Sequence, residues 1–104
     1  MRASALRGLA TLLQHTPGTV APHVLALAPR LVRLARFQAP PHAGARPLVR
    51  ATAVDCLGAL VARLPYHQLH PCRALVAEGL LAVLDDPHRA VRRRAGACRN
   101  AWLL

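Results

Sequence analysis

Apolar residues recur along the chain at steps of three and four in five separate stretches. This spacing places them on one face of an α-helix. In the last stretch, the apolar positions are Val91, Ala95, Cys98 and Trp102. Asp86 and Pro87 precede them, and these residue types favour an N-cap and a first helical position. The pattern predicts a helix over residues 87–104 that packs by one face.

The same spacing predicts four helices upstream, over residues of about 3–15, 19–37, 48–64 and 70–84. Pro29 lies inside the second of these helices and predicts a kink or a late helix start, because it lacks a backbone donor. Pro65 follows the third helix directly and should end it, and the fourth should start near His70 and Pro71. Short connections between successive helices favour antiparallel neighbours.

One short motif recurs through the predicted helices. Val91-Arg92 with Ala95 is matched by Val49-Arg50 with Ala53, and more loosely by Leu6-Arg7 with Ala10. The three arginines lie 43 and 42 residues apart, a period typical of HEAT or armadillo arrays. Asp86 precedes Arg92 by six residues, which is the spacing of the Asp and Arg partners in HEAT repeats. Gly44 takes the equivalent place before Arg50, so the expected Asp/Arg ladder is incomplete.

These observations predict an all-α fold, a HEAT-like helical-repeat solenoid fragment of about five antiparallel helices. Pro40, Pro41, Gly44 and Pro47 mark the clearest linker. The whole chain, residues 1–104, is then one array: a repeat over 3–37, a linker over 38–47, a repeat over 48–84 and a final half-repeat over 87–104.

The basic residues give information about the binding partner rather than about the fold. All fourteen are arginine, only four residues are acidic, and the formal net charge is +10. Such a balance favours acidic protein surfaces or nucleic acid, although arginine without lysine is also typical of a GC-rich coding sequence. On a helical wheel, four arginines of the last helix fall away from its apolar stripe: Arg89, Arg92, Arg93 and Arg99.

Guanidinium groups suit bidentate pairing with carboxylates or phosphates, so this face is the candidate partner-binding site. The alternative is a solvated face with one or two structural contacts, which the spacing from Asp86 favours for Arg92. Trp102 joins the candidate set as a possible interface anchor, although a core or end-cap position suits it better.

Enzyme chemistry is poorly supported by the sequence. Asp85 and Asp86 are better explained as a helix boundary than as a catalytic pair, and Ser4 is the only serine. His67, His70 and Cys72 lie within six residues but lack a fourth ligand, so a polar turn is favoured over a metal site. The sequence therefore predicts no enzyme activity, no metal, no cofactor and no small-molecule substrate.

The cysteines, the apolar runs and the N-terminal composition bear on the compartment in which the protein works. The three cysteines form no CxxC pair, which favours buried reduced thiols over disulfides or a zinc knuckle. No apolar run approaches the roughly twenty residues that a spanning helix needs. Residues 1–54 lack acids, as mitochondrial transit peptides do, but serine is almost absent and the segment repeats the design of the rest.

The second half of the chain resembles a known family. Residues 49–104 combine a Val-Arg helix opening, the Arg63-Leu64-Pro65 stop, the Leu69-His70-Pro71 entry, Leu84-Asp85-Asp86, and a Val91-Arg92 helix that ends in an aromatic before Leu103-Leu104. In this order they resemble the C-terminal HEAT-repeat region of the adaptor family named for methyl-methanesulfonate sensitivity and nucleotide-excision repair. Residues 1–47 fit the preceding repeat in outline.

The resemblance implies a non-enzymatic adaptor of cytosolic iron–sulfur protein assembly, found in cytoplasm and nucleus. Its implied protein partners are a WD-repeat propeller and other assembly components, with repair helicases and polymerases as clients. The implied processes are DNA repair, transcription and genome maintenance. The surface near the last two helices, concave or terminal, is the expected docking site.

A basic helical module that binds nucleic acid non-specifically is the competing hypothesis. Its affinity would come from charge and would fall with salt. Phe37, Tyr66 and Trp102 are the only aromatic residues and lie far apart in sequence, so a stacking platform for bases is not predicted. Specific nucleic-acid recognition is therefore not expected.

Overall fold

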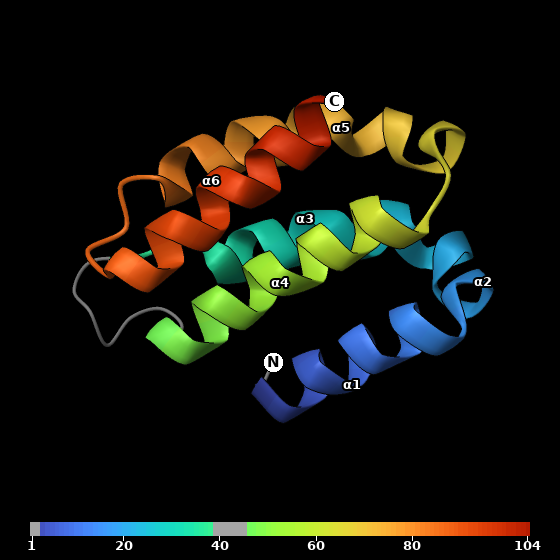
Figure 1. The fold of residues 1–104 in the computed structure, drawn as a ribbon, viewed down its shortest axis with the longest axis horizontal. Helices are drawn as coiled ribbons and strands as arrows, with labels where there is room; N and C mark the ends of the chain where they lie inside the picture. The colour runs from blue at the N-terminus through green and yellow to red at the C-terminus, as the bar shows by residue number, and fades with distance from the viewer. Residues whose placement is uncertain (1–2, 39–45) are drawn as a thin grey trace.

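The computed structural model describes residues 3–38 and 46–104, and the regular structure in these residues is entirely helical (Figure 1). A short helix α2 and a 3-10 turn η1 connect α1 to α3. The all-α prediction is confirmed. The elements are α1 (Ala3–His15), α2 (Pro17–Val20), η1 (Ala21–His23), α3 (Val24–Ala35), α4 (Pro47–Arg63), α5 (Tyr66–Val83) and α6 (Arg89–Leu103).

The longer helices form two layers. Helices α1, α4 and α6 lie side by side in one layer and run in the same direction, while α3 and α5 run the opposite way behind them (Figure 1). Helix α4 packs against α1, α3 and α6, and α5 packs against α3 and α6. This repeated stacking of antiparallel helices is the helical-repeat fragment that the sequence predicted.

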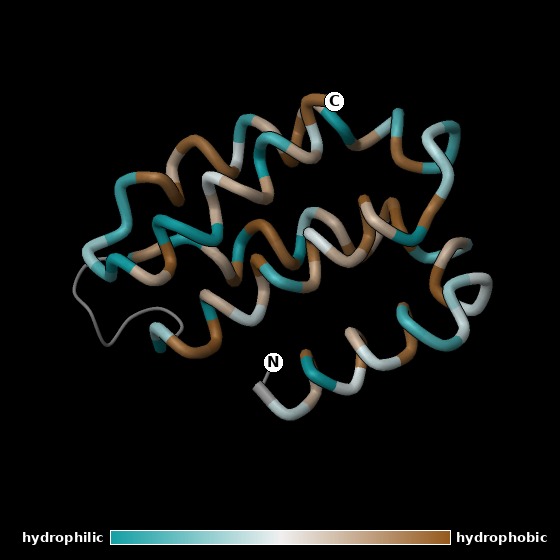
Figure 2. The backbone as a smooth tube through the Cα atoms, viewed as in Figure 1, coloured by the Kyte–Doolittle hydropathy of each residue, from teal (hydrophilic) through white to brown (hydrophobic). Residues whose placement is uncertain are grey.

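The core follows the repeated motif. Ala53 of α4 and Ala95 of α6 are both fully buried, and Cys56 and Cys98 are buried three residues further along the same helices. Figure 2 shows hydrophobic and hydrophilic segments following one another along each helix, as expected where one side of a helix is buried. Residues at equivalent places of the repeat therefore fill one continuous core between the two layers.

The start of α5 differs from the prediction. Helix α5 begins at Tyr66, four residues before the expected start near His70, and Pro71 lies inside it. Its N-cap, Pro65, has an extended backbone, and the Gln68 N–H donates to the Pro65 carbonyl at 3.0 Å. The prediction was wrong because it took Pro71 for a helix start, whereas Pro71 lies in the second turn, where its ring costs one backbone hydrogen bond.

The second predicted helix is divided into parts. In place of one helix over residues 19–37, the chain forms α2, then η1 around Pro22, then α3. Pro29 lies within α3 without ending it, so the interruption falls at Pro22. Helix α4 begins at Pro47, and residues 39–45 of the predicted linker lie outside the described residues.

Candidate functional site

A buried ion pair joins α4 to the connection between α5 and α6. Arg50 Nε donates to Asp86 Oδ2 at 2.7 Å, and Arg50 Nη2 donates to Asp86 Oδ1 at 3.0 Å. Arg50 is 3% exposed and Asp86 is 1% exposed. The guanidinium carbon also lies 5.1 Å from the centroid of the Phe37 ring. This bidentate pair ties one repeat to the next.

The charge of Asp86 is fixed by these contacts. Burial alone would raise the pKa of this carboxyl, but the hydrogen bonds from Arg50 and from the His88 N–H, at 2.8 Å, outweigh it. The positive charge of Arg50 acts in the same direction, and the pKa of Asp86 lies below its ordinary value. Asp86 is therefore a carboxylate at neutral pH.

Two local expectations about Asp86 are corrected. The N-cap of α6 is His88, with no side-chain capping bond, so α6 begins two residues after the expected Pro87. The spacing of Asp86 and Arg92 suggested a side-chain pair, but Arg92 Nη1 donates to backbone carbonyls instead, those of Asp86 at 2.8 Å and Pro87 at 3.1 Å. The Asp86 carboxylate pairs with Arg50 of the preceding repeat and also accepts the N–H of His88, the residue before α6, but it does not act as the N-cap of α6.

The candidate residues of α6 occupy different environments. Arg89 and Arg93 are exposed one helical turn apart, whereas Arg92 and Arg99 are partly buried. Arg99 Nε donates to the Ala77 carbonyl of α5 at 3.2 Å. Trp102 is 2% exposed, and its Nε1–H donates to the Leu57 carbonyl at 2.9 Å. Partner binding by these five residues remains a prediction, and the exposed part of the set is Arg89 and Arg93.

One arginine of α6 outside the predicted partner-binding set makes a surface ion pair. Arg94 Nη1 lies 3.0 Å from Asp55 Oδ2 of α4, and both side chains are about half exposed. Partial burial raises the pKa of Asp55, and the charge of Arg94 opposes that rise. Nothing in the local sequence indicated this pair, because its members are 39 residues apart.

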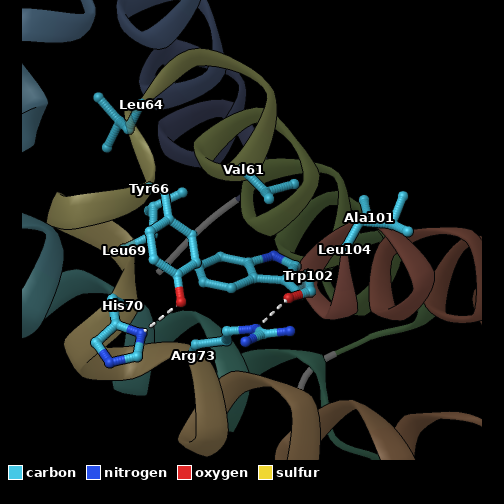
Figure 3. A pocket seen from close by; sticks show the side chains of 9 residues that line it. All are labelled: Val61, Leu64, Tyr66, Leu69, His70, Arg73, Ala101, Trp102 and Leu104. Atoms are coloured by element: carbon cyan, nitrogen blue, oxygen red, sulfur yellow. Dashed lines mark hydrogen bonds between the residues drawn. The ribbon is translucent and has the colours of Figure 1, made fainter.

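A pocket of about 270 Å³ opens between the start of α5 and the end of α6 (Figure 3). Tyr66 Oη lies 2.9 Å from His70 Nδ1 at its rim. Arg73 Nε donates to the Trp102 carbonyl at 2.9 Å, and Arg73 Nη2 donates to the Leu103 carbonyl at 2.6 Å. These bonds fix the end of α6 against α5. The lining residues are Val61, Leu64, Tyr66, Leu69, His70, Arg73, Ala101, Trp102 and Leu104.

The thiols are shielded rather than reactive. All three cysteines are free and buried. Burial, with a smaller contribution from the charge of Asp55, raises the pKa of Cys56 to about 11 and that of Cys98 to about 12. Burial also raises the pKa of Cys72. In the part of the chain that the structure describes, no three His, Cys, Asp or Glu side chains are arranged to hold a metal ion, and no helix there is long and apolar enough to cross a membrane.

The chain is similar in sequence to proteins of known name. No family model matches it. The MMS19 nucleotide excision repair protein homolog of Xenopus tropicalis is 38% identical over 104 residues, which cover 100% of this chain and 9% of the relative. The Arabidopsis thaliana homolog is 44% identical over 55 residues, which cover 53% of this chain and 5% of the relative. The DNA repair/transcription protein mms19 of Schizosaccharomyces pombe is 40% identical over 57 residues, which cover 55% of this chain and 6% of the relative.

The chain thus spans less than a tenth of the length of these relatives. The names of these relatives link them to DNA repair and transcription. The likeness to the Xenopus tropicalis homolog extends over all the described helices of both layers. Over this stretch, the chain belongs to the MMS19 nucleotide excision repair protein family.

Proposed function

We propose that this chain is a non-enzymatic docking module that joins iron–sulfur assembly components to client apo-proteins of DNA repair and transcription. Membership of the MMS19 family supports the link to repair and transcription. The proposed direct partners are a WD-repeat propeller and other assembly components, and the proposed clients are repair helicases and polymerases. The proposed locations are cytoplasm and nucleus.

The observation that carries a docking role is the exposed arginine pair on α6. Arg89 and Arg93 lie on the same face and make no hydrogen bond or ion pair within the described residues. Exposed guanidinium groups with no internal partner are available for carboxylates of another protein. Arg92, Arg99 and Trp102 donate to backbone carbonyls of the chain itself, and they complete the proposed partner-binding set.

The test is a pulldown of the purified propeller protein by the chain across a series of salt concentrations, with duplex DNA as a competitor. The variant Arg89→Glu/Arg93→Glu should lose the propeller while keeping its helicity, because neither side chain contributes an internal contact. A matched control is Arg30→Glu/Arg33→Glu, which makes the same charge change on exposed positions of α3. Equal binding by wild type and the α6 variant would contradict the site.

Non-specific nucleic-acid binding is the second candidate, favoured by the net charge of +10. It predicts that DNA displaces the propeller, and that both double variants weaken DNA binding to a similar degree. It also predicts a steep loss of binding as salt is raised, because counterion release drives such complexes. Retention of the propeller at physiological salt in the presence of DNA would argue against it.

A further inference from the structure

Helices α4 and α6 occupy equivalent places in the repeat, 42 residues apart. Ala53 and Ala95 are equivalent and fully buried, and Cys56 and Cys98 are equivalent and buried. Each of the two helices stacks beside the preceding helix of the same layer, α1 for α4 and α4 for α6 (Figure 1). Cys56 Sγ lies 3.2 Å from the Leu6 carbonyl oxygen of α1, and Cys98 lines a groove with Val54 and Gly58 of α4. Helix α4 has a neighbouring helix of its layer on both sides, α1 and α6. The side of α4 that α6 covers can therefore be compared with the equivalent side of α6.

The face of α4 that α6 covers is mostly apolar, but it also carries Asp55, which pairs with Arg94 of α6. Val54 and Gly58 line a groove together with α6 residues, and Val61 lines the terminal pocket beside Trp102. Ala51, on the same side of α4, is buried.

The equivalent face of α6 has a different character. Arg93 replaces Ala51, Asn100 replaces Gly58, and both are exposed. Arg89, equivalent to Pro47, is exposed as well. No helix among the described residues covers this side of α6. We refer to Arg89, Arg92, Arg93 and Asn100 as the open face of α6. Ala97 and Leu103 take the places of Asp55 and Val61 on this side. The open face of α6 is therefore more cationic than the equivalent face of α4 and favours an acidic neighbour.

The repeated arginine points to how that neighbour is held. At Arg50, the guanidinium is buried because Asp86, from the segment that follows in the array, supplies a carboxylate. Arg7 is exposed, and the sequence has Gly44 at the position equivalent to Asp86. Arg92 is the third member and is partly buried. Its Nη1 bonds two backbone carbonyls, while its Nε and Nη2 have no partner in the described part of the chain.

We propose that the open face of α6 binds an acidic segment of a partner protein, and that a carboxylate of this segment pairs with Arg92 in the bidentate manner of Asp86 with Arg50. The proposal rests on the docking function above and names the chemistry of its partner. Arg92 Nε and Nη2 are the two donors of a bidentate fork, and they correspond to the atoms with which Arg50 holds Asp86. The partner continues the array as an additional repeat would.

Charge argues against a second copy of this chain, and the lack of aromatic side chains argues against nucleic acid. A second copy of this chain carries the same +10 and has only Glu78 and Asp85 beyond the two acids already paired, so it offers little to an arginine face. Nucleic acid would meet the same positive charge, but the open face presents no aromatic side chain for stacking. A carboxylate-bearing protein segment satisfies both the charge and the bidentate geometry.

The test uses a fluorescein-labelled helical peptide that starts with the Leu-Asp-Asp-Pro-His turn of this chain, and a matched peptide with both aspartates replaced by asparagine. Fluorescence anisotropy gives the affinity of the whole chain for each peptide. The aspartate peptide should bind, and the asparagine peptide should bind about tenfold more weakly or worse, because the charge-assisted bidentate pair is lost. Equal binding of the two peptides, or no binding at millimolar peptide, would overturn the proposal.

Variants locate the contact. Arg92→Lys keeps the charge but removes the planar fork, so we expect a loss of about tenfold in affinity. The control Arg33→Lys, on exposed α3, should change the affinity less than about twofold. Since Arg92 also holds the start of α6, Arg93→Gln serves as a second variant without an internal contact, and it should weaken the aspartate peptide as well. Equal losses in Arg92→Lys and Arg33→Lys would show binding by bulk charge and refute the site.

Two further readouts separate this proposal from its rivals. The Nε–H NMR signal of Arg92 should gain protection from solvent exchange when the aspartate peptide binds, and an unchanged signal contradicts the proposed pairing. Displacement of the peptide by a short DNA duplex, with a steep salt dependence, would assign the face to nucleic acid instead. If the propeller binds wild type and Arg92→Lys equally, the docking function stands and this inference fails. If the aspartate peptide binds through Arg92 but the propeller does not bind, this inference stands and the proposed docking of the propeller fails.

Discussion

Removing the carboxylate of Asp86 should destabilise the fold more than any change at an exposed charge. The substitution Asp86→Asn keeps the size of the side chain but leaves Arg50 charged and 3% exposed, without its anionic partner. Removing one member of a buried ion pair costs about 3–5 kcal/mol, because the other charge is left uncompensated. That is a large share of the roughly 5–15 kcal/mol by which a domain is stable.

The measurement is urea denaturation followed by far-UV circular dichroism, with the free energy of unfolding taken from linear extrapolation. Thermal unfolding gives a second readout, since 1 kcal/mol shifts the Tm of a domain this size by about 4 °C or more. The matched control is Asp55→Asn, which removes the acid of the half-exposed pair with Arg94. Because solvent screens that pair, the control should lose no more than about 1 kcal/mol.

A double variant separates the pair from its surroundings. Arg50→Met/Asp86→Leu replaces both charges by apolar groups, which is often neutral or stabilising in a buried site, so it should recover most of the loss. It does not replace the bond from Asp86 Oδ1 to the His88 N–H, whose loss should leave a deficit of about 1 kcal/mol. The reasoning is refuted if Asp86→Asn is no more destabilising than Asp55→Asn, or if the double variant is less stable than Asp86→Asn.

Three other predictions concern the same core. Gly79→Ala should lose about 1–3 kcal/mol in urea denaturation, because the added Cβ would overlap the Val32 side chain, whereas Gly58→Ala, with open space at its Cβ, should gain about 0.5–1 kcal/mol from its better helix propensity. A thiol reagent at neutral pH should label the native chain slowly and label all three cysteines promptly in urea, and fast native labelling would contradict their burial. The pKa of Asp86 is lower in the folded chain than in the unfolded chain. Its contribution to stability is therefore present above the unfolded pKa of about 4 and is lost as the pH falls through the folded pKa. A plot of unfolding free energy against pH should be flatter in Asp86→Asn than in the wild type.

The sequence by itself determined the all-helical class, the apolar faces of the helices and the repeat, but not every helix boundary. These features are local, since a stripe at three- and four-residue steps specifies both the helix and the side that is buried. Val91, Ala95, Cys98 and Trp102 are accordingly all buried along one side of α6. The family resemblance rested on an ordered string of such local features, and the relatives confirm it.

Tertiary structure alone decided which charges meet. Local spacing associated Asp86 with Arg92, but the stacking of α6 on α4 brings the carboxylate to Arg50, 36 residues away. Trp102 suited either the core or an interface on a helical wheel, and its bond to the Leu57 carbonyl 45 residues away places it in the core. A periodic pattern gives the direction of a side chain, whereas its partner depends on the distance between helices that only packing sets. For the same reason the open face of α6 became visible only when α4, its covered equivalent, could be compared with it.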